Sequence, residues 1–179
     1  MKKKNNRPVP YYKRSISPGH MLVVMEKGLI SFEVPLGWID RKTDIGISLY
    51  DRQPPDNDCI FEVSMIRHPM FPIRDLPLWK VLHDSPNLQG KGLSREDIVE
   101  ETRPGIQIAH LHYRAMHPTD NRLAIFCTCM IRALEFHVLM SYAYWPEESD
   151  RLAPVWARAI ETFQIGIPVE GGAPVPNPN

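Results

Sequence analysis

The sequence has no long hydrophobic run. None of its 179 residues belongs to a stretch approaching the roughly 20 apolar residues that span a bilayer. The longest early apolar run, residues 21–25, is too short and too late for a secretory signal, because Asn and Pro residues occupy the place where such a signal is hydrophobic. We therefore expect a protein that is neither exported nor membrane-inserted, without a transmembrane segment and located in the cytoplasm.

Cysteine is scarce as well. The three cysteines, Cys59, Cys127 and Cys129, are too few and too oddly numbered for a disulfide framework. A reducing compartment is the simpler interpretation, and it agrees with the cytoplasmic location.

The chain also has no net charge, since Lys+Arg and Asp+Glu both number 21. The whole molecule therefore lacks the charge excess typical of nucleic-acid or membrane-surface proteins, and we expect no specific nucleic-acid partner. The charge is unevenly placed, because six basic residues precede the first acidic residue, Glu26. They are Lys2, Lys3, Lys4, Arg7, Lys13 and Arg14.

With 43% hydrophobic residues, the chain has enough apolar material for one core of ordinary size. Its ends differ in composition from this body. Residues 1–20 are basic and rich in Asn and Pro, and residues 168–179 are rich in Pro and Gly. We predict a flexible basic arm over 1–20, a single α+β domain over 21–167 and a flexible tail over 168–179.

Strand patterns dominate the body. Residues 21–26 and 29–34 flank Lys27-Gly28 and predict a hairpin, whose second strand alternates Ile30, Phe32 and Val34 with polar residues and so has one wet face. Further strands are predicted at 45–50, 59–67, 106–116, 122–131 and 136–145, the last three as a meander.

Two helices are predicted. One is a short helix over 75–83, capped by Asp75. Between the two helices, a short helix or turn is expected near 94–97, with Ser94 as its capping residue. The other runs from about 147 to 163 and is the clearest amphipathic helix, although Pro154 lies inside the pattern and indicates a kink or a later start. Its apolar stripe consists of Leu152, Val155, Trp156, Ala159, Ile160 and Phe163. The fold class is α+β, a central, mostly antiparallel sheet flanked by helices.

Two sequence features carry a resemblance to a known superfamily. The first is Phe32-x-Val34-Pro35-x-Gly37-Trp38, and the second is the strand 136–145 leading into a helix that ends Ala159-Ile160-Glu161-Thr162-Phe163. Over residues 28–166 the chain resembles the superfamily of the photosystem II extrinsic protein PsbP, which includes the bacterial DcrB-like (DUF1795-type) proteins and the nuclear Ran-release factors.

The resemblance implies a PsbP/DcrB-like sandwich with no catalytic residues to carry over. Known members are mainly binding proteins: photosystem subunits, a partner of a small GTPase, and cytoplasmic chaperones for type VI secretion effectors that bear membrane segments. The missing signal favours the cytoplasmic roles.

No catalytic motif stands out from the residues themselves. The candidate nucleophiles are Ser64, Ser141, Cys127 and Cys129, and none of them lies in a Gly-x-Ser-x-Gly or other activating context. Gly90-Lys91-Gly92 lacks the spacing of a phosphate loop. We expect no catalytic residue and no cofactor. A triad assembled in space stays open as an alternative.

Alternating His and Cys residues are the weak candidates for a metal site. His110 and His112 share one face of a predicted strand, and Cys127 and Cys129 share a face of the next. Two His and two Cys ligands suit zinc if those faces coincide, but Cys is commonly a small buried hydrophobe. We expect no metal here.

A cluster of apolar residues at mid-chain is the candidate partner-binding surface: Met65, Met70, Phe71, Leu76 and Trp79. Met-rich surfaces adapt to varied partners, although a satellite core under a long loop explains the same residues equally well. The nearby acidic group Glu96, Asp97, Glu100 and Glu101 is interpreted as a solvated face.

Together these features favour a non-catalytic protein-binding module, a cytoplasmic chaperone or adaptor that holds a hydrophobic segment of another protein. Self-association is left open. Two alternatives remain: an accessory subunit of a larger, photosystem-like complex, and a metal-dependent or hydrolytic enzyme.

Overall fold

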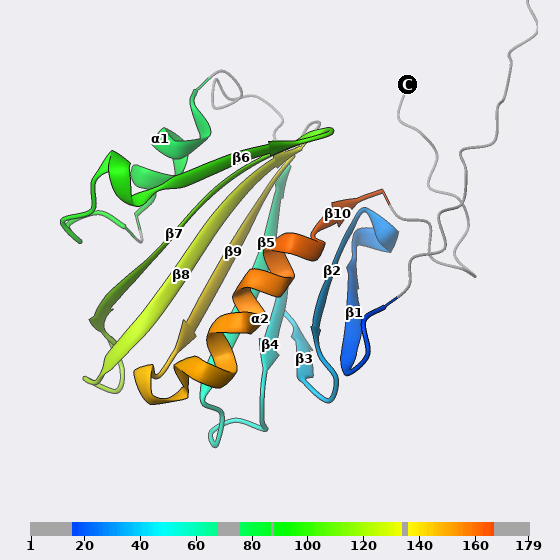
Figure 1. The fold of residues 1–179 in the computed structure, drawn as a ribbon, viewed down its shortest axis with the longest axis vertical. Coiled ribbons are helices and arrows are strands. Elements are labelled where there is room, and N and C mark those ends of the chain that lie inside the picture. The colour runs from blue at the N-terminus through cyan, green and yellow to red at the C-terminus, as the bar shows by residue number, and fades with distance from the viewer. Residues whose placement is uncertain (1–15, 68–75, 87, 134–135, 167–179) are drawn as a thin grey trace, which may run out of the picture. The chain divides into compact units, whose positions relative to one another are not determined.

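The computed structural model describes residues 16–67, 76–86, 88–133 and 136–166. Over these residues the chain forms two antiparallel sheets, two α-helices and short 3-10 turns, which confirms the α+β fold class (Figure 1). The described residues fall into two compact units, one reaching Leu36 and resuming at Arg158, and the other comprising Gly37–Ala157. The boundaries predicted at 20 and 167 are not tested by this division and stay predictions.

The first unit contains the predicted hairpin. Strands β1 (His20–Met25) and β2 (Ile30–Pro35) are antiparallel, with Met25 opposite Ile30. They are joined by a 3-10 turn, η1 (Glu26–Gly28), in which Lys27 adopts the left-handed φ of 57°. A short strand that the sequence did not suggest, β10 (Gln164–Ile165), pairs with the other edge of β2.

The predicted wet face of β2 is wrong. Ser31 and Glu33, which alternate with the apolar residues, are both buried. The reason is that Arg158, from the C-terminal helix, contacts the Glu33 side chain and gives the buried carboxylate a charged partner. Arg158 donates to its Oε2 over 2.7 and 3.1 Å, and the Glu33 backbone N–H donates to Thr162 Oγ1 over 2.9 Å.

The second unit is built on a seven-stranded antiparallel sheet with the order β3-β4-β5-β9-β8-β7-β6. The meander β7–β8–β9 is confirmed, and β5 pairs with β9 although Cys59 and its partner Tyr144 are far apart in sequence. The two edge strands, β3 and β6, were not predicted. The bounds are β3 (Ile39–Lys42), β4 (Gly46–Tyr50), β5 (Cys59–Arg67), β6 (Val99–Arg103), β7 (Ile106–Met116), β8 (Leu123–Ala133) and β9 (Phe136–Tyr144).

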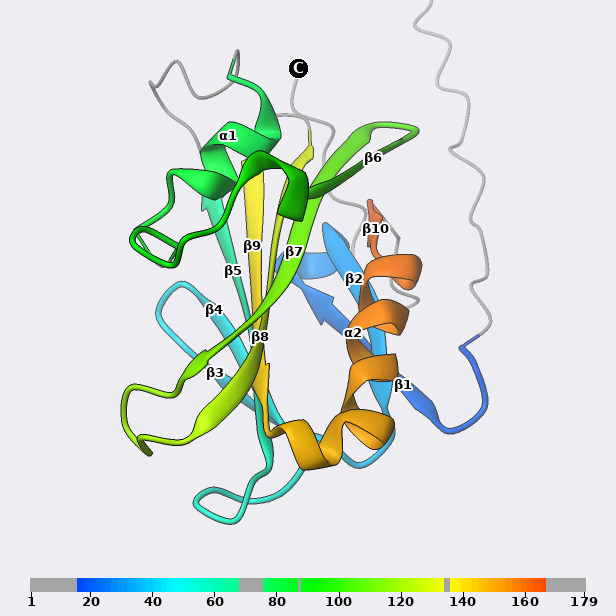
Figure 2. The ribbon, with the colours of Figure 1, turned by 60° about the vertical axis from the view of Figure 1, so that its left-hand side comes forward.

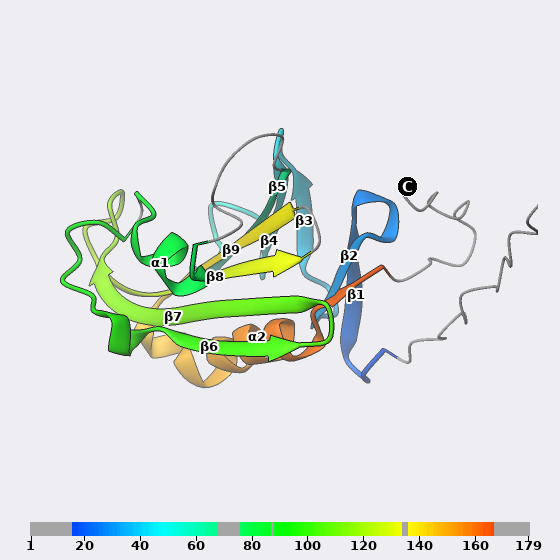
Figure 3. The ribbon, with the colours of Figure 1, turned by 90° about the horizontal axis from the view of Figure 1, so that it is seen from above.

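The two helices lie on opposite sides of this sheet (Figure 3). Helix α1 (Leu78–His83) begins after Pro77, later than predicted, and covers one end of the sheet (Figure 2). The predicted cap, Asp75, lies outside the described residues. Helix α2 (Ser149–Thr162) follows the 3-10 turn η4 (Pro146–Glu148) and continues through Pro154. None of the described helices is long and apolar enough to cross a membrane.

Side chains on the α2 side of the sheet form an aromatic core. The Phe61 ring lies 5.3 Å from that of Tyr142 and 5.8 Å from that of Trp156, both edge-on. The buried Tyr142 hydroxyl donates to the Leu152 carbonyl over 3.2 Å, so the polar end of the ring is satisfied. The predicted apolar stripe of α2 is buried throughout and is confirmed.

The opposite side of the sheet has a smaller core beneath α1. Leu78 and Leu82 of the helix pack with Ala109, Leu111 and Met130 of β7 and β8. The 3-10 turn η3 (Arg95–Asp97) and Ile98 close this core. Ser94 is the capping residue of this turn, as predicted, and its backbone N–H donates to the Asp97 carboxylate over 2.7 Å. This side therefore positions the segment around α1 against the edge of the sheet.

Candidate binding site

The structure separates the residues predicted to bind a partner. Met65 lies in β5 opposite Val138, and since it is four residues from Phe61 it points to the α2 side of the sheet. Leu76 and Trp79 lie on the α1 side, where Leu76 is 39% exposed. Met70 and Phe71 lie outside the described residues. The predicted surface is thus represented by Leu76 and Trp79 alone.

Trp79 is packed rather than presented to solvent. It is half-buried against the core beneath α1, and the Arg95 guanidinium lies 5.2 Å above its ring. Its backbone N–H donates to Glu100 Oε1 over 3.3 Å, and Glu100 Oε2 accepts from Arg95 over 2.6 Å. This environment corresponds to the satellite core that the sequence left open for this tryptophan.

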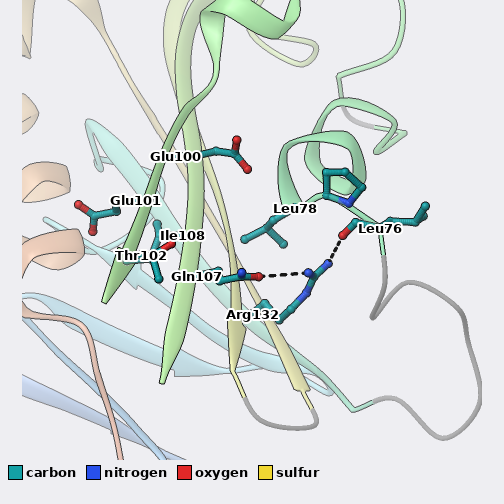
Figure 4. Close-up of a pocket in the computed structure, with 9 residues that line it drawn as sticks. Leu76, Leu78, Glu100, Glu101, Thr102, Gln107, Ile108 and Arg132 are labelled. Carbon is teal, nitrogen blue, oxygen red and sulfur yellow. Dashed lines mark hydrogen bonds between the residues drawn. The ribbon is translucent and has the colours of Figure 1, made fainter. Parts of the chain in front are cut away.

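Beside Leu76 the structure has a pocket of about 390 Å³ between the start of α1 and the sheet (Figure 4). Leu76, Pro77 and Leu78 form its apolar side. The sheet side is mostly polar and is formed by residues of β6, β7 and β8: Glu100, Glu101, Thr102, Gln107, Ile108 and Arg132.

Arg132 joins the two sides of this pocket. Its Nη2 donates to the Leu76 carbonyl over 2.6 Å, and its Nη1 donates to Gln107 Oε1 over 3.1 Å (Figure 4). Its Nε donates to Nε2 of the buried His137 over 3.1 Å, so that nitrogen of the imidazole acts as the acceptor. A planar guanidinium with several donors suits this role, because one side chain fixes the loop end, the pocket floor and a neighbouring strand.

Strand β6 forms the outer wall of the pocket and is an edge strand of the sheet among the described residues. Glu100 and Glu101, neighbours on β6, point in opposite directions (Figure 4), and Glu101 is paired with Arg103. Val99, at the start of the strand, is 55% exposed. The pocket therefore opens beside β6, whose backbone is paired with another described strand on one side only.

The His and Cys residues considered for a metal do share a face. His110 is directly opposite Cys129 and His112 is opposite Cys127, so all four side chains point to the same side of the sheet. Even so, no group of three or more His, Cys, Asp or Glu residues in the described part of the chain is placed to hold a metal ion. His112 is exposed, whereas both thiols are buried.

The thiols are also held in their neutral form. Burial raises the pKa of Cys127 to about 12 and that of Cys59, with help from the Asp51 carboxylate, to about 12. Burial also raises the pKa of Cys129 well above its ordinary value. A neutral buried thiol is a poor nucleophile and a poor metal ligand.

Sequence reasoning missed the polar floor of the pocket. Gln107 and Arg132 are directly opposite each other on β7 and β8, and Thr102 is opposite Gln107 on β6. The available signal was their position as polar residues at alternate places in strands that are otherwise apolar. Without the pairing register, nothing indicated that they lie in one row across three strands.

Comparison with known proteins places the fold. The profile of the Alr1449 family matches residues 21–169. The uncharacterised protein alr1449 of Nostoc sp. (strain PCC 7120) is 21% identical over 164 residues, which are 88% of this chain and 83% of that protein.

Solved structures show the same architecture at low sequence identity. The cyanobacterial PsbP (CyanoP) of Synechocystis sp. PCC 6803 matches with a TM-score of 0.57 and 12% identity over 86% of this chain and 98% of that one. LpqN, involved in cell envelope biogenesis of Mycobacterium tuberculosis, matches with a TM-score of 0.53 and 17% identity over 82% and 90%. A Bacteroides thetaiotaomicron protein has a TM-score of 0.58 and 9% identity, and this chain spans 48% of its length. These matches confirm the PsbP-like fold.

Proposed function

This chain belongs to the Alr1449 family, and from that premise we propose that it is a non-catalytic module that binds an extended segment of another polypeptide. One observation carries the proposal: the pocket beside Leu76 is lined by an edge strand, β6. A segment added to a sheet edge gains main-chain hydrogen bonds from the strand and gains specificity from a pocket that takes one of its side chains.

The chemistry of the pocket indicates what such a segment presents. Leu76 and Pro77 offer exposed apolar surface, while the exposed side chains of Thr102 and Gln107 offer hydrogen-bond donors on the floor. An apolar side chain flanked by polar backbone meets both requirements, because the side chain packs on the leucine and backbone carbonyls face the donors. This is the mixed surface of an extended polypeptide.

Two features support a binding role without catalysis. The three thiols are buried and neutral, as described above. The charged groups at the pocket are used in structural contacts, Arg132 with Leu76 and Glu100 with Arg95. The finer role that we propose is a cytoplasmic chaperone or adaptor, for which the apolar rim at Leu76 is the support.

A matched pair of exposed leucines tests the site. Leu76 is 39% exposed at the pocket rim, and Leu123 is 44% exposed on β8 outside the pocket lining. In a native pull-down from the source cell, Leu76→Asp is expected to reduce partner recovery at least about tenfold, since a buried carboxylate without a partner costs several kcal/mol. Leu123→Asp introduces the same charge and is expected to leave recovery unchanged.

Hydrogen exchange on the recovered complex tests the edge-strand part. Amides of Val99–Arg103 that face outward are expected to exchange more slowly in the complex than in the free protein, because a paired strand protects them. Equal recovery with Leu76→Asp and wild type, or unchanged exchange along β6, would contradict the assignment.

A further inference from the structure

A second pocket, of about 340 Å³, lies at another end of the seven-stranded sheet. Its residues come from the β4–β5 loop, from the turn between β7 and β8 and from the end of β9, which meet at one end of the sheet (Figure 1). Ile60 and Ala143 are paired across β5 and β9 and face the same side, where the small alanine leaves room above the sheet. The volume suits a small group or one long side chain.

Aromatic rings form the walls of this pocket, and an arginine of the chain already covers one face of two of them. The Arg122 guanidinium lies 4.3 Å from the centroid of the Trp145 ring, and that of Arg41 lies 5.5 Å from the centroid of Tyr50. The negative face of an aromatic ring attracts a guanidinium or ammonium group at such distances. His117 contacts the edge of Trp145 at 5.4 Å between ring centroids and completes the wall.

Two of the residues that line the pocket are acidic. Asp58 and Asp120 line the pocket, whereas no lysine or arginine does. Both carboxylates make their contacts through Oδ2, Asp58 in ion pairs with Arg52 and Arg151 over 2.9 and 2.8 Å and Asp120 with Nδ1 of His117 over 2.6 Å. A carboxylate has about four lone-pair sites on two oxygens, so Oδ1 of each group can still accept a donor.

We propose that this second pocket binds an organic cation, a guanidinium or alkylammonium group on an apolar stem. The stem packs on Ile60 and Ala143, the charged head lies among the aromatic rings, and the carboxylates of Asp58 and Asp120 accept its hydrogen bonds. A free amine and a basic side chain of a polypeptide share this chemistry. The site is independent of the pocket beside Leu76 and of the function proposed for it.

A charged ligand and its neutral analogue test the assignment. N-acetyl-arginine amide, titrated into the full chain and followed by the indole N–H resonance of Trp145 in 0.15 M salt, is expected to bind with a Kd of about 1 mM, a value typical of a small ligand. N-acetyl-citrulline amide has nearly the same shape without the charge and is expected to bind at least about tenfold more weakly. Equal binding of the two, or no shift of the Trp145 resonance with either, would overturn the proposal.

Two further probes distinguish the source of the cation. Butylamine represents a free amine, and the tripeptide Gly-Arg-Gly represents a polypeptide. Tighter binding of butylamine assigns the pocket to small amines, and tighter binding of the tripeptide assigns it to a basic side chain of a partner. Both outcomes uphold the cation site, and failure of both rejects it.

Variants separate the pocket from general electrostatic attraction. Asp120→Asn removes a lining carboxylate in an exposed turn and is expected to weaken binding of N-acetyl-arginine amide at least about fivefold. Asp150→Asn removes the same charge from an exposed position on α2 and is expected to leave binding unchanged. Ala143→Leu fills the pocket without changing charge and is expected to abolish binding, with thermal melting as the folding control. Equal effects of the two Asp variants, or full binding by a folded Ala143→Leu, would exclude this pocket.

Discussion

At the scale of single residues, burial decides the chemistry of the groups that looked reactive in the sequence. Cys59, Cys127 and Cys129 lie in or beside the core, and His110 is half-buried on β7. A charge is poorly solvated in such places, so thiols stay protonated and an imidazole stays neutral. The three cysteines and His110 therefore act as packing groups in this fold.

Thiol reactivity provides the first prediction. In the native protein at pH 8 all three cysteines are expected to resist alkylation by iodoacetamide, because their raised pKa values leave almost no thiolate. In denaturant all three are expected to react rapidly. Mass spectrometry of samples quenched at intervals counts the labelled sites. A cysteine alkylated in the native state as fast as in denaturant would reveal an activated thiol.

The pH dependence of stability provides the second. Burial lowers the pKa of His110 below its usual value of about 6.5, so the unfolded chain binds this proton more readily than the folded one. The contribution of His110 is therefore fully present above about pH 6.5 and is lost as the pH falls from there through the folded pKa. As the pH is lowered from about 7 to about 5, the free energy of unfolding measured in urea is expected to fall less for His110→Gln than for wild type.

The opposite slope for that variant, or identical slopes, would contradict the neutral state of His110. His112→Gln, an exposed change on the same strand, controls for the loss of an imidazole as such. A histidine titration by NMR measures the pKa of His110 directly and separates it from that of His83, which hydrogen bonding to Asp84 raises.

At the scale of elements, β2 shows how a buried charge is accommodated by a helix. The Glu33 side chain is 1% exposed and is paired with Arg158 of α2, while Thr162 Oγ1 accepts from the Glu33 backbone and donates to the Arg158 carbonyl over 2.7 Å. Removal of one partner of a buried ion pair leaves an uncompensated charge, whereas removal of both partners does not.

A double-mutant comparison tests this pair. Arg158→Met is expected to lower the Tm clearly, and Glu33→Met combined with Arg158→Met is expected to recover a large part of that loss, because the buried charge is then gone. Thermal melting followed by circular dichroism measures both. If the double variant is less stable than Arg158→Met, the pair contributes attraction beyond the relief of a buried charge.

At the scale of the whole molecule, the order of the strands separates local from distant pairing. The β7–β8 and β8–β9 pairs join neighbours in the chain, whereas the β5–β9 pair joins Cys59 with Tyr144. Distant pairing requires closure of a long loop, which costs entropy before any contact forms. We therefore expect the meander β7–β9 to form early and β5 to dock late.

Folding kinetics check this order. Ile108→Val in β7 is expected to act mainly on the folding rate, and Val63→Ala in β5 mainly on the unfolding rate, which corresponds to a high and a low φ-value. Both residues are about 1% exposed, so Ile108→Val is expected to cost about 1 kcal/mol and Val63→Ala about 2 kcal/mol, enough for a reliable ratio. Stopped-flow chevron plots measure the rates, and reversed φ-values would contradict the proposed order.

The strands and the long helix were largely predictable. Residues 59–67 and 106–116 were predicted with the bounds that β5 and β7 have, and the stripe of α2 was identified correctly. The edge strand β6 was missed because its sequence, Val-Glu-Glu-Thr-Arg, is largely polar and lacks a hydrophobic face. Such a polar edge strand is identified only by its pairing with a neighbouring strand, which here is β7.

The candidate site was predicted less completely. Leu76 was named from its apolar neighbourhood, but Thr102, Gln107 and Arg132 were not, and Met65 points to the other side of the sheet. Local periodicity states which side chains share a face of one strand. It does not state which row of the next strand lies alongside.

What the sequence by itself determined about this protein is therefore its α+β class, the elements with strong periodicity and the burial of α2, because these follow from spacing along a few consecutive residues. Only the tertiary structure decided that β6 ends the sheet beside α1, that Arg132 binds Leu76, and that Glu33 is buried with Arg158. Those contacts join residues 56 and 125 positions apart, and their geometry follows from strand register and packing, which no local pattern encodes.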